Sequence, residues 1–115
     1  MSSPGAVAHI EVLDGLADPT RRRILDALAG YGSATATTLA GGLPISRQAV
    51  VKHLALLDRV GLVSGQRAGR EMRYRLRPDR LEAAAHWLAE LAGEWDRRLQ
   101  LIKHIAESAE TDPDQ

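Results

Sequence analysis

The sequence contains no cysteine and no apolar run longer than a few residues. Without cysteine the chain can form neither disulfides nor thiolate metal sites, and it cannot sense redox state through a thiol. A membrane-spanning helix needs roughly 20 apolar residues in succession. The first residues, MSSPGAVAH, lack the basic and apolar regions of a signal peptide. We therefore expect a cytoplasmic protein.

The chain also lacks a net charge, because 15 basic residues balance 15 acidic ones. This neutrality hides an uneven distribution. Residues 46–80 contain nine basic and three acidic side chains, a local charge of +6, and the remaining residues carry −6. A basic segment on an otherwise acidic protein is typical of a surface that binds a polyanion. A single arginine is more simply explained as a solvated surface residue, so the interpretation depends on the whole set.

A chain of 115 residues fits one small domain, and its 44% hydrophobic and 26% charged residues are ordinary for a globular protein. We expect a single domain over residues 1–115, with loose ends at residues 1–5 and 110–115.

The first 30 residues predict two helices. Apolar residues at helical spacing indicate a first helix over residues 7–17. Asp18 is a good N-cap and Pro19 a good first residue for the second helix, which ends at Gly30 or Gly32. The predicted buried residues of the second helix are Ile24, Leu25 and Leu28.

Residues 35–58 predict a helix-turn-helix. Thr35 is a candidate cap for the third helix, and Ser46 caps the fourth helix, which stops at Gly61. The inward-facing residues of the third helix are Leu39, Ala40 and Leu43. The core-facing residues of the fourth helix fall at helical spacing: Val50, Leu54 and Leu57.

The pattern then changes period. Between residues 63 and 76, apolar residues alternate on both sides of the sequence RAGR, which predicts a two-stranded hairpin with Gly69 at a tight tip. Tyr74 alternates with Arg73 and Arg75, so we expect it to face the core rather than to stack on a base.

A long helix is predicted over residues 79–109. Apolar residues recur every seven positions on it, with a second seam beside them that Arg98 interrupts. An apolar edge of this length usually needs a second chain. The heptad positions are Leu81, Leu88, Trp95, Ile102 and Ala109, and the adjoining seam contains Ala84, Leu91 and Ile105.

Together these elements predict a mainly α protein with a small β-hairpin, in the order α-α-α-α-β-β-α. This is the order of a winged helix-turn-helix, with the helix-turn-helix at 35–58, the wing at 63–76 and a dimerisation helix at 79–109. In this fold the basic segment coincides with the surface that meets DNA.

The side chains of the fourth helix suit such contacts. Arg47 and Gln48 occupy its first exposed turn, and their types match guanine and adenine edges respectively. Lys52 is placed to contact a phosphate, and Ser46 can add a phosphate contact to its capping role. The candidates in the wing, for phosphate or minor-groove contact, are Arg67, Arg70 and Arg73.

Three stretches resemble the ArsR/SmtB family of bacterial winged-helix repressors: LADPTRRRILDALA, SRQAVVKHLALLDRVGLV and GREMRYRL. The resemblance covers about residues 10–105. The tail HWLAELAGEWDRRLQLIKHI is similar to the metal-independent, SdpR-like branch, which often acts on its own promoter. The Arg22 position matches the family motif, where a structural role is at least as expected as a DNA contact.

The resemblance implies further roles. His53 matches the family's usual histidine, and because it lies next to the predicted core residue Leu54, we expect it to be packed or bonded to phosphate rather than to bind a metal. Val51 departs from the family's serine and can only touch a thymine methyl. The resemblance also implies a homodimer in which the terminal helices pair. The interface residues would be Val7, Ile10, Leu13, Leu81, Leu88, Leu91, Trp95, Leu99 and Ile102.

The family's metal sites are incomplete here. The third-helix site needs cysteines where this chain has TLAGGL. For the C-terminal site, His104 and Glu107 supply one half, but Leu91 and Gly93 stand where the other ligands would fall. His86 with Glu82 or Glu90 has no obvious third ligand. We expect neither a metal nor another cofactor.

The leading hypothesis is a homodimeric repressor that binds a pseudo-palindromic operator in double-stranded DNA. The alternatives are a metal- or ligand-responsive derepressor of the same family and a winged-helix module that binds a protein. An enzyme is not expected, because Ser46 and His53 lie two turns apart without an evident orienting acid. The sequence identifies no small-molecule inducer.

Overall fold

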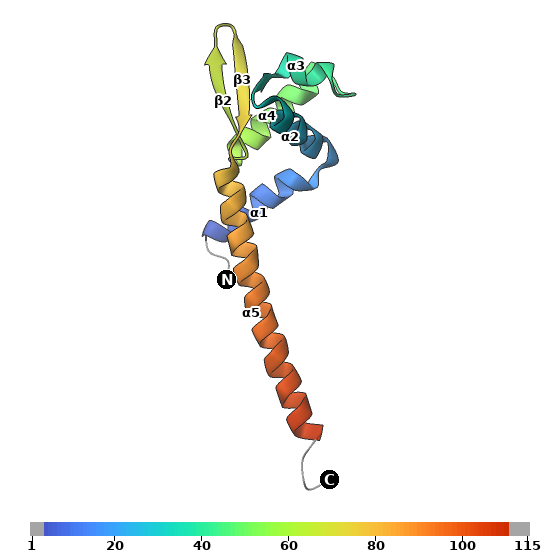
Figure 1. Cartoon of the computed structure of the whole chain (residues 1–115), viewed down its shortest axis with the longest axis vertical. Coiled ribbons are helices and arrows are strands. Elements are labelled where there is room, and N and C mark those ends of the chain that lie inside the picture. Colours follow the sequence, from blue (N-terminus) through green and yellow to red (C-terminus); the bar gives the residue numbers. More distant parts are fainter. Residues whose placement is uncertain (1–3, 111–115) are drawn as a thin grey trace. The chain divides into compact units, whose positions relative to one another are not determined.

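The structure, a computed structural model, describes residues 4–110 (Figure 1). Its helices and strands follow one another in the order predicted for a winged helix-turn-helix, with one additional short strand. They are α1 (Pro4–Ala17), α2 (Pro19–Tyr31), β1 (Ala34–Thr35), α3 (Ala36–Gly41), α4 (Arg47–Arg59), β2 (Val63–Ala68), β3 (Glu71–Leu76) and α5 (Pro78–Glu110).

The chain divides into two compact units, one up to Ala84 and one from Ala85 onward, whereas the sequence predicts a single domain. The first unit contains the helix-turn-helix and the wing. In the second unit, the described residues all belong to α5. The described part of the second unit therefore has no core of its own, because one helix cannot enclose a core.

Helix α1 begins at Pro4, so Pro4 and Gly5 do not belong to the loose arm predicted for residues 1–5. Proline is tolerated in the first turn of a helix, because the N–H that it lacks would be unpaired there. Glu110 likewise ends α5 instead of starting a loose tail. Residues 1–3 and 111–115 of the predicted ends lie outside the described part of the chain.

The core of the first unit is formed by the apolar faces predicted from helical spacing. Ile24, Leu28 and Leu39 are almost completely buried, as are Val50, Leu54 and Leu57 on α4, and Leu25 is buried beside them. Ala40 and Leu43 are half-buried and pack against this core. The predicted core residues of these three helices are thus confirmed.

The wing is part of a three-stranded antiparallel sheet with strand order β1-β3-β2, not a hairpin alone. Strand β1 pairs Ala34 with Tyr74 and Thr35 with Arg73. Two residues are too few to show the alternation that predicts a strand, and Thr35 also serves as a helix cap. Gly69 at the hairpin tip has a φ of +66°, which confirms the predicted tight turn.

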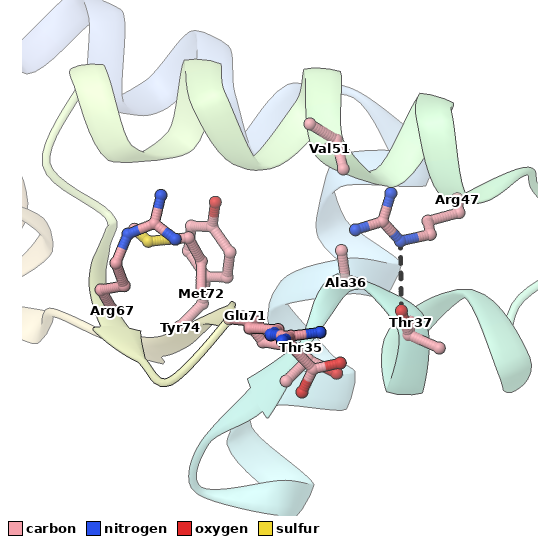
Figure 2. Close-up of a pocket in the computed structure, with 10 residues that line it drawn as sticks. Thr35, Ala36, Thr37, Arg47, Val51, Arg67, Glu71, Met72 and Tyr74 are labelled. Carbon is pink, nitrogen blue, oxygen red and sulfur yellow. Dashed lines mark hydrogen bonds between the residues drawn. The ribbon is translucent and has the colours of Figure 1, made fainter.

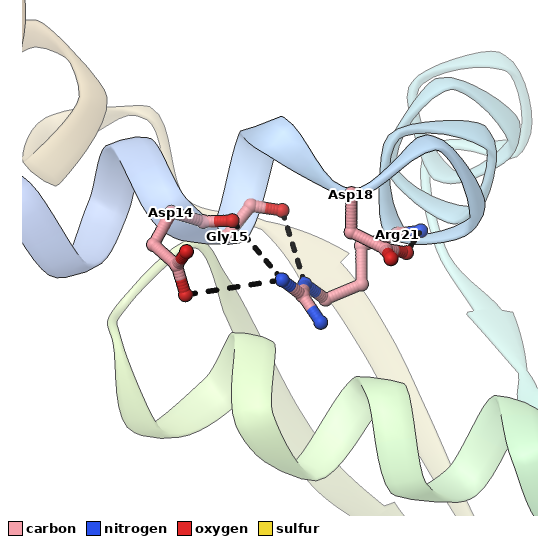
Figure 3. Close-up of polar contacts among 4 residues, drawn as sticks. All are labelled: Asp14, Gly15, Asp18 and Arg21. Atoms are coloured by element: carbon pink, nitrogen blue, oxygen red, sulfur yellow. Dashed lines mark hydrogen bonds and ion pairs between the residues drawn. The ribbon is translucent and has the colours of Figure 1, made fainter.

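The junction between α1 and α2 is held by polar contacts (Figure 3). Asp18 caps α2 as predicted, because its carboxylate accepts a hydrogen bond of 2.9 Å from the backbone N–H of Arg21. This bond, with smaller contributions from the charges of Arg21 and His53, holds the pKa of Asp18 below its ordinary value of 3.8, although partial burial acts in the opposite direction. The Arg21 guanidinium in turn donates to the backbone carbonyls of Asp14 and Gly15.

The part of α5 in the second unit exposes most of its apolar side chains. Trp95 is 57% exposed and Ile102 is 62% exposed, and Leu88, Leu99 and Ile105 are exposed as well. Arg98, which interrupts the adjoining seam, pairs with Glu94 at 3.2 Å. Across residues 4–110, no helix combines the length and the apolar character that crossing a membrane requires.

Candidate nucleic-acid interface

Two capping side chains fix the starts of the two helices of the helix-turn-helix. Thr35 Oγ1 accepts a hydrogen bond of 3.2 Å from the backbone N–H of Thr38, and Ser46 Oγ accepts one of 3.1 Å from that of Ala49. Each bond satisfies an N–H group that the first turn of a helix leaves unpaired. Both predicted caps are confirmed, and the Ser46 cap determines which side chains occupy the first turn of α4.

Helix α4 has one buried and one exposed face. Its core-facing residues are 0% exposed. The face on the other side is turned to solvent, and its residues include five of the predicted DNA contacts: Ser46, Arg47, Gln48, Val51 and Lys52. One helix therefore presents all five together.

His53 lies differently from these five residues. Its side chain is half-buried, and it is close enough to Asp18 for its charge to lower the pKa of that carboxyl group. This position fits a histidine packed between α4 and the start of α2 better than one directed outward.

Arg47 is joined to α3 by a hydrogen bond. Its Nε donates to Oγ1 of Thr37 at 3.1 Å, as Figure 2 shows. An arginine side chain has five N–H donors, one on Nε and two on each terminal nitrogen. The contact therefore uses the Nε donor and none of the four donors on the terminal nitrogens.

A cavity of about 230 Å³ lies between the helix-turn-helix and the wing (Figure 2). It brings together three of the predicted arginines, Arg47 from α4 with Arg67 and Arg70 from the wing, although they are far apart in the sequence. The other lining residues are Thr35, Ala36, Thr37, Val51, Glu71, Met72 and Tyr74.

The register of the wing separates its arginines. Side chains of directly opposed residues project to the same face of a hairpin. Arg67 is paired with Met72, whereas Arg73 is paired with Gln66 on the opposite face. Arg73 there donates to Ser33 Oγ at 3.2 Å. The three arginines predicted as one group thus fall on both faces of the wing and its tip.

Tyr74 is half-buried and packs against the core, which confirms that it does not face outward as a base stacker. Two side chains that the sequence analysis did not single out accompany the predicted ones. Thr37 bonds Arg47, and Gln66 lies beside Arg73 and Arg75. Arg75, beside Gln66, already belonged to the basic segment of residues 46–80. No sequence signal connects Thr37 with Arg47, which lies ten positions later.

In the arginine run at the start of α2, the structural contacts belong to Arg21 rather than Arg22. The Arg21 side chain is 15% exposed and holds the carbonyl oxygens of α1. Arg22 is exposed and pairs with Asp26 on its own helix at 3.2 Å. The structural role expected at Arg22 is thus filled by its neighbour Arg21.

The candidate metal ligands do not gather. Within the described ranges, no group of three or more His, Asp or Glu side chains is placed to hold a metal ion. His86 forms an ion pair of 2.9 Å with Glu90 on the same helix. His104 and Glu107 both lie near the end of α5, on exposed positions.

The predicted dimer residues are largely at the surface of their own units. On α1, Val7 and Ile10 are exposed and Leu13 is half-buried. On α5, one residue of the set, Leu91, is half-buried, and the others are exposed: Leu81, Leu88, Trp95, Leu99 and Ile102.

Comparison with known proteins gives consistent results. A family model described as a helix-turn-helix domain matches residues 16–66. The chain is 33% identical over 88 residues to the transcriptional repressor SdpR of Bacillus subtilis, and the match covers 76% of this chain and 97% of that protein. It is 44% identical over 68 residues to a helix-turn-helix-type transcriptional regulator of Mycobacterium tuberculosis, with 59% and 63% of the two chains covered.

Among solved structures, the chain is similar to an ArsR-like transcriptional regulator from Rhodococcus sp. RHA1. The TM-score is 0.81 and the sequence identity 42%, and the match covers 90% of this chain and 97% of that one.

Proposed function

Since this chain belongs to the ArsR family of winged-helix, DNA-binding transcriptional regulators, we propose that it is a repressor that occupies a pseudo-palindromic operator as a homodimer. The observation that carries the proposal is the shared surface of α4 and the wing. There the exposed face of α4 lies beside Arg67 and Arg70 around one cavity.

Helix α4 supplies the base contacts in this proposal. Arg47 suits the O6 and N7 acceptors of guanine, and Gln48 suits the N6 and N7 groups of adenine. Val51, which is 38% exposed, offers two methyl groups to the methyl group of a thymine. The sequence preference of the protein thus depends on these three side chains.

The phosphate contacts come from two elements. Lys52 and the capping Ser46 on α4 meet the backbone beside the major groove. Arg67 lies on one face of the wing, Arg73 on the other and Arg70 at the tip, so the wing can contact phosphates on either side of a minor groove. His53, being half-buried, adds a phosphate bond only where the backbone approaches it closely.

A second copy of the chain completes the operator-binding unit. Exposed apolar side chains on α1 and α5 would be covered by their counterparts, since surfaces of this kind are rare on monomeric proteins. A twofold dimer places its two α4 helices in major grooves about one helical turn apart, roughly 10 base pairs. An operator of this size that overlaps a promoter excludes polymerase.

We also propose that the protein is not an enzyme and acts in the cytoplasm, where the DNA lies. Ser46 Oγ is engaged as a helix cap. It stands about 10 Å along the helix axis from His53, which is too far for a nucleophile and its base.

The test is fluorescence anisotropy with labelled DNA from upstream of the gene and with a scrambled duplex. Titrations are run across a salt series, first with a chelator and then with zinc. We expect selective binding that weakens steeply with salt and is unchanged by zinc. An Arg22→Ala variant, which lacks an exposed arginine outside the proposed interface, serves as a control and should bind both duplexes as wild type does.

The alternatives give different results. Release of DNA on addition of zinc would favour a metal-responsive derepressor. Equal, weak binding to both duplexes in every condition would refute the proposal and favour a protein-interaction module.

A further inference from the structure

The bond between Thr37 and Arg47 connects two exposed side chains of the helix-turn-helix. Hydrogen bonds at such positions add little to folding stability, because water replaces them when they break. The bond crosses from α3 to α4 and ends on the residue best suited to recognise guanine. The main effect of this hydrogen bond is therefore on the orientation of the Arg47 side chain.

We propose that Thr37 is a positioning residue for base recognition. It holds the Arg47 guanidinium so that the two terminal nitrogens, and not Nε, meet the O6 and N7 atoms of a guanine. An arginine can bind these two acceptors with both terminal nitrogens or with Nε and one of them. Because Nε donates to Thr37, only the first arrangement remains. This inference rests on the DNA-binding function proposed above.

The first turn of α3, which contains Thr37, is itself held by hydrogen bonds. Thr35 caps α3 one residue before its first turn, and its hydroxyl is also bonded to that of Thr38 at 3.1 Å. Threonine has few accessible χ1 rotamers because it is branched at Cβ. The oxygen that accepts from Arg47 is thus held in place by the start of α3.

Fixing Arg47 before DNA arrives favours selective binding. A free arginine side chain populates many rotamers and loses this freedom when it binds a base. A side chain that is already oriented loses less, so more of the interaction remains as affinity. An Arg47 without its partner could also adopt other hydrogen-bonding arrangements, which would weaken the preference for guanine.

The test is a double-mutant cycle of Thr37→Val and Arg47→Ala. Valine has nearly the shape of threonine but cannot accept a hydrogen bond. Thr37→Ser keeps the acceptor and serves as the matched control. The probe is the duplex that the wild-type protein enriches most from a random-sequence library, together with the same duplex in which one G·C pair is exchanged for A·T. The exchanged pair is the G·C pair that wild type distinguishes from A·T and that the Arg47→Ala variant does not.

We expect wild type to prefer the G·C duplex about 10- to 100-fold, the range given by a bidentate arginine–guanine pair. Thr37→Val should reduce this preference about three- to tenfold with an unchanged salt slope, and Thr37→Ser should stay within about twofold of wild type. In the Arg47→Ala background, Thr37→Val should have no further effect on the preference. Thermal unfolding of each variant should stay near that of wild type.

Three results would overturn the inference. A Thr37→Val variant with the full preference for G·C would show that Arg47 needs no partner. An equal loss of binding on both duplexes, persisting in the Arg47→Ala background, would mean that Thr37 contacts the DNA backbone itself. A Thr37→Val variant that is unfolded would show that Thr37 stabilises the fold instead of positioning Arg47. If wild-type protein enriches no sequence, the proposed function has failed instead.

Discussion

The guanidinium of Arg21 on α2 donates a hydrogen bond of 3.2 Å from Nε to the backbone carbonyl of Gly15 on α1. A second bond of 3.0 Å reaches the neighbouring carbonyl of Asp14. Gly15 itself is buried, and a Cβ there would meet the Leu62 side chain at 3.1 Å. Arg21 thus satisfies carbonyl groups near the C-terminal end of α1, where the last turn of a helix leaves its carbonyls unpaired.

Arg21→Ala is therefore expected to destabilise the protein. The loss should be about 1.5–3 kcal/mol, the usual contribution of hydrogen bonds to a charged side chain. Urea unfolding followed by circular dichroism measures it. Arg22→Ala, whose exposed ion pair with Asp26 is worth at most about 1 kcal/mol, is the control. Equal effects of both substitutions would contradict the assignment of the structural role to Arg21.

The lowered pKa of Asp18 predicts that protonation of this carboxyl group contributes to acid unfolding. Because its pKa in the folded protein lies below 3.8, ionised Asp18 stabilises the fold above that pH. This contribution is lost as the pH falls through the lowered value. Asp18→Asn keeps a capping side chain but cannot ionise. The difference in Tm between wild type and Asp18→Asn should therefore shrink between about pH 6 and about pH 2. A difference that stays constant over this range would exclude a role for the charge.

Substitutions of Arg47 and Lys52, which are both exposed on α4, should affect DNA binding in different ways. Arg47→Ala should lower affinity for the preferred DNA by about 1–3 kcal/mol and relax base preference at one position. Lys52→Ala should weaken binding to all sequences alike and reduce the salt slope by about one. Anisotropy titrations on selected and random duplexes separate these cases. Equal losses on both duplexes for Arg47→Ala would refute its role in base recognition.

Ile102→Asp tests the proposed dimer. Ile102 is 62% exposed in the single chain and lies on the heptad seam of α5. A charge at such a position would have to be desolvated in the interface, so we expect monomers by light scattering and weaker operator binding. Gln100→Asp places the same charge on the same helix, away from the seam, and should leave the dimer intact. A dimeric Ile102→Asp protein would show that the interface lies elsewhere.

Most of the fold was predictable because its signals are local. Helix caps at Asp18, Thr35 and Ser46 depend on residues three positions away, and a buried helix face repeats every three to four residues. Strand β1 was missed because its pairing with β3 joins residues about 40 positions apart, and two residues carry no period. The start of α1 at Pro4 was missed because the apolar stripe begins only later.

The candidate site shows the same division. The sequence alone determined which side chains α4 turns to solvent, because helical period and the Ser46 cap fix its faces. It also determined the basic character of residues 46–80 and the apolar seam of α5. The tertiary structure decided that Thr37 holds Arg47, that Arg21 rather than Arg22 holds α1, and that Arg73 lies across the wing from Arg67. These relations depend on how separate elements pack and on strand register, which are set by long-range contacts that no short stretch of sequence contains.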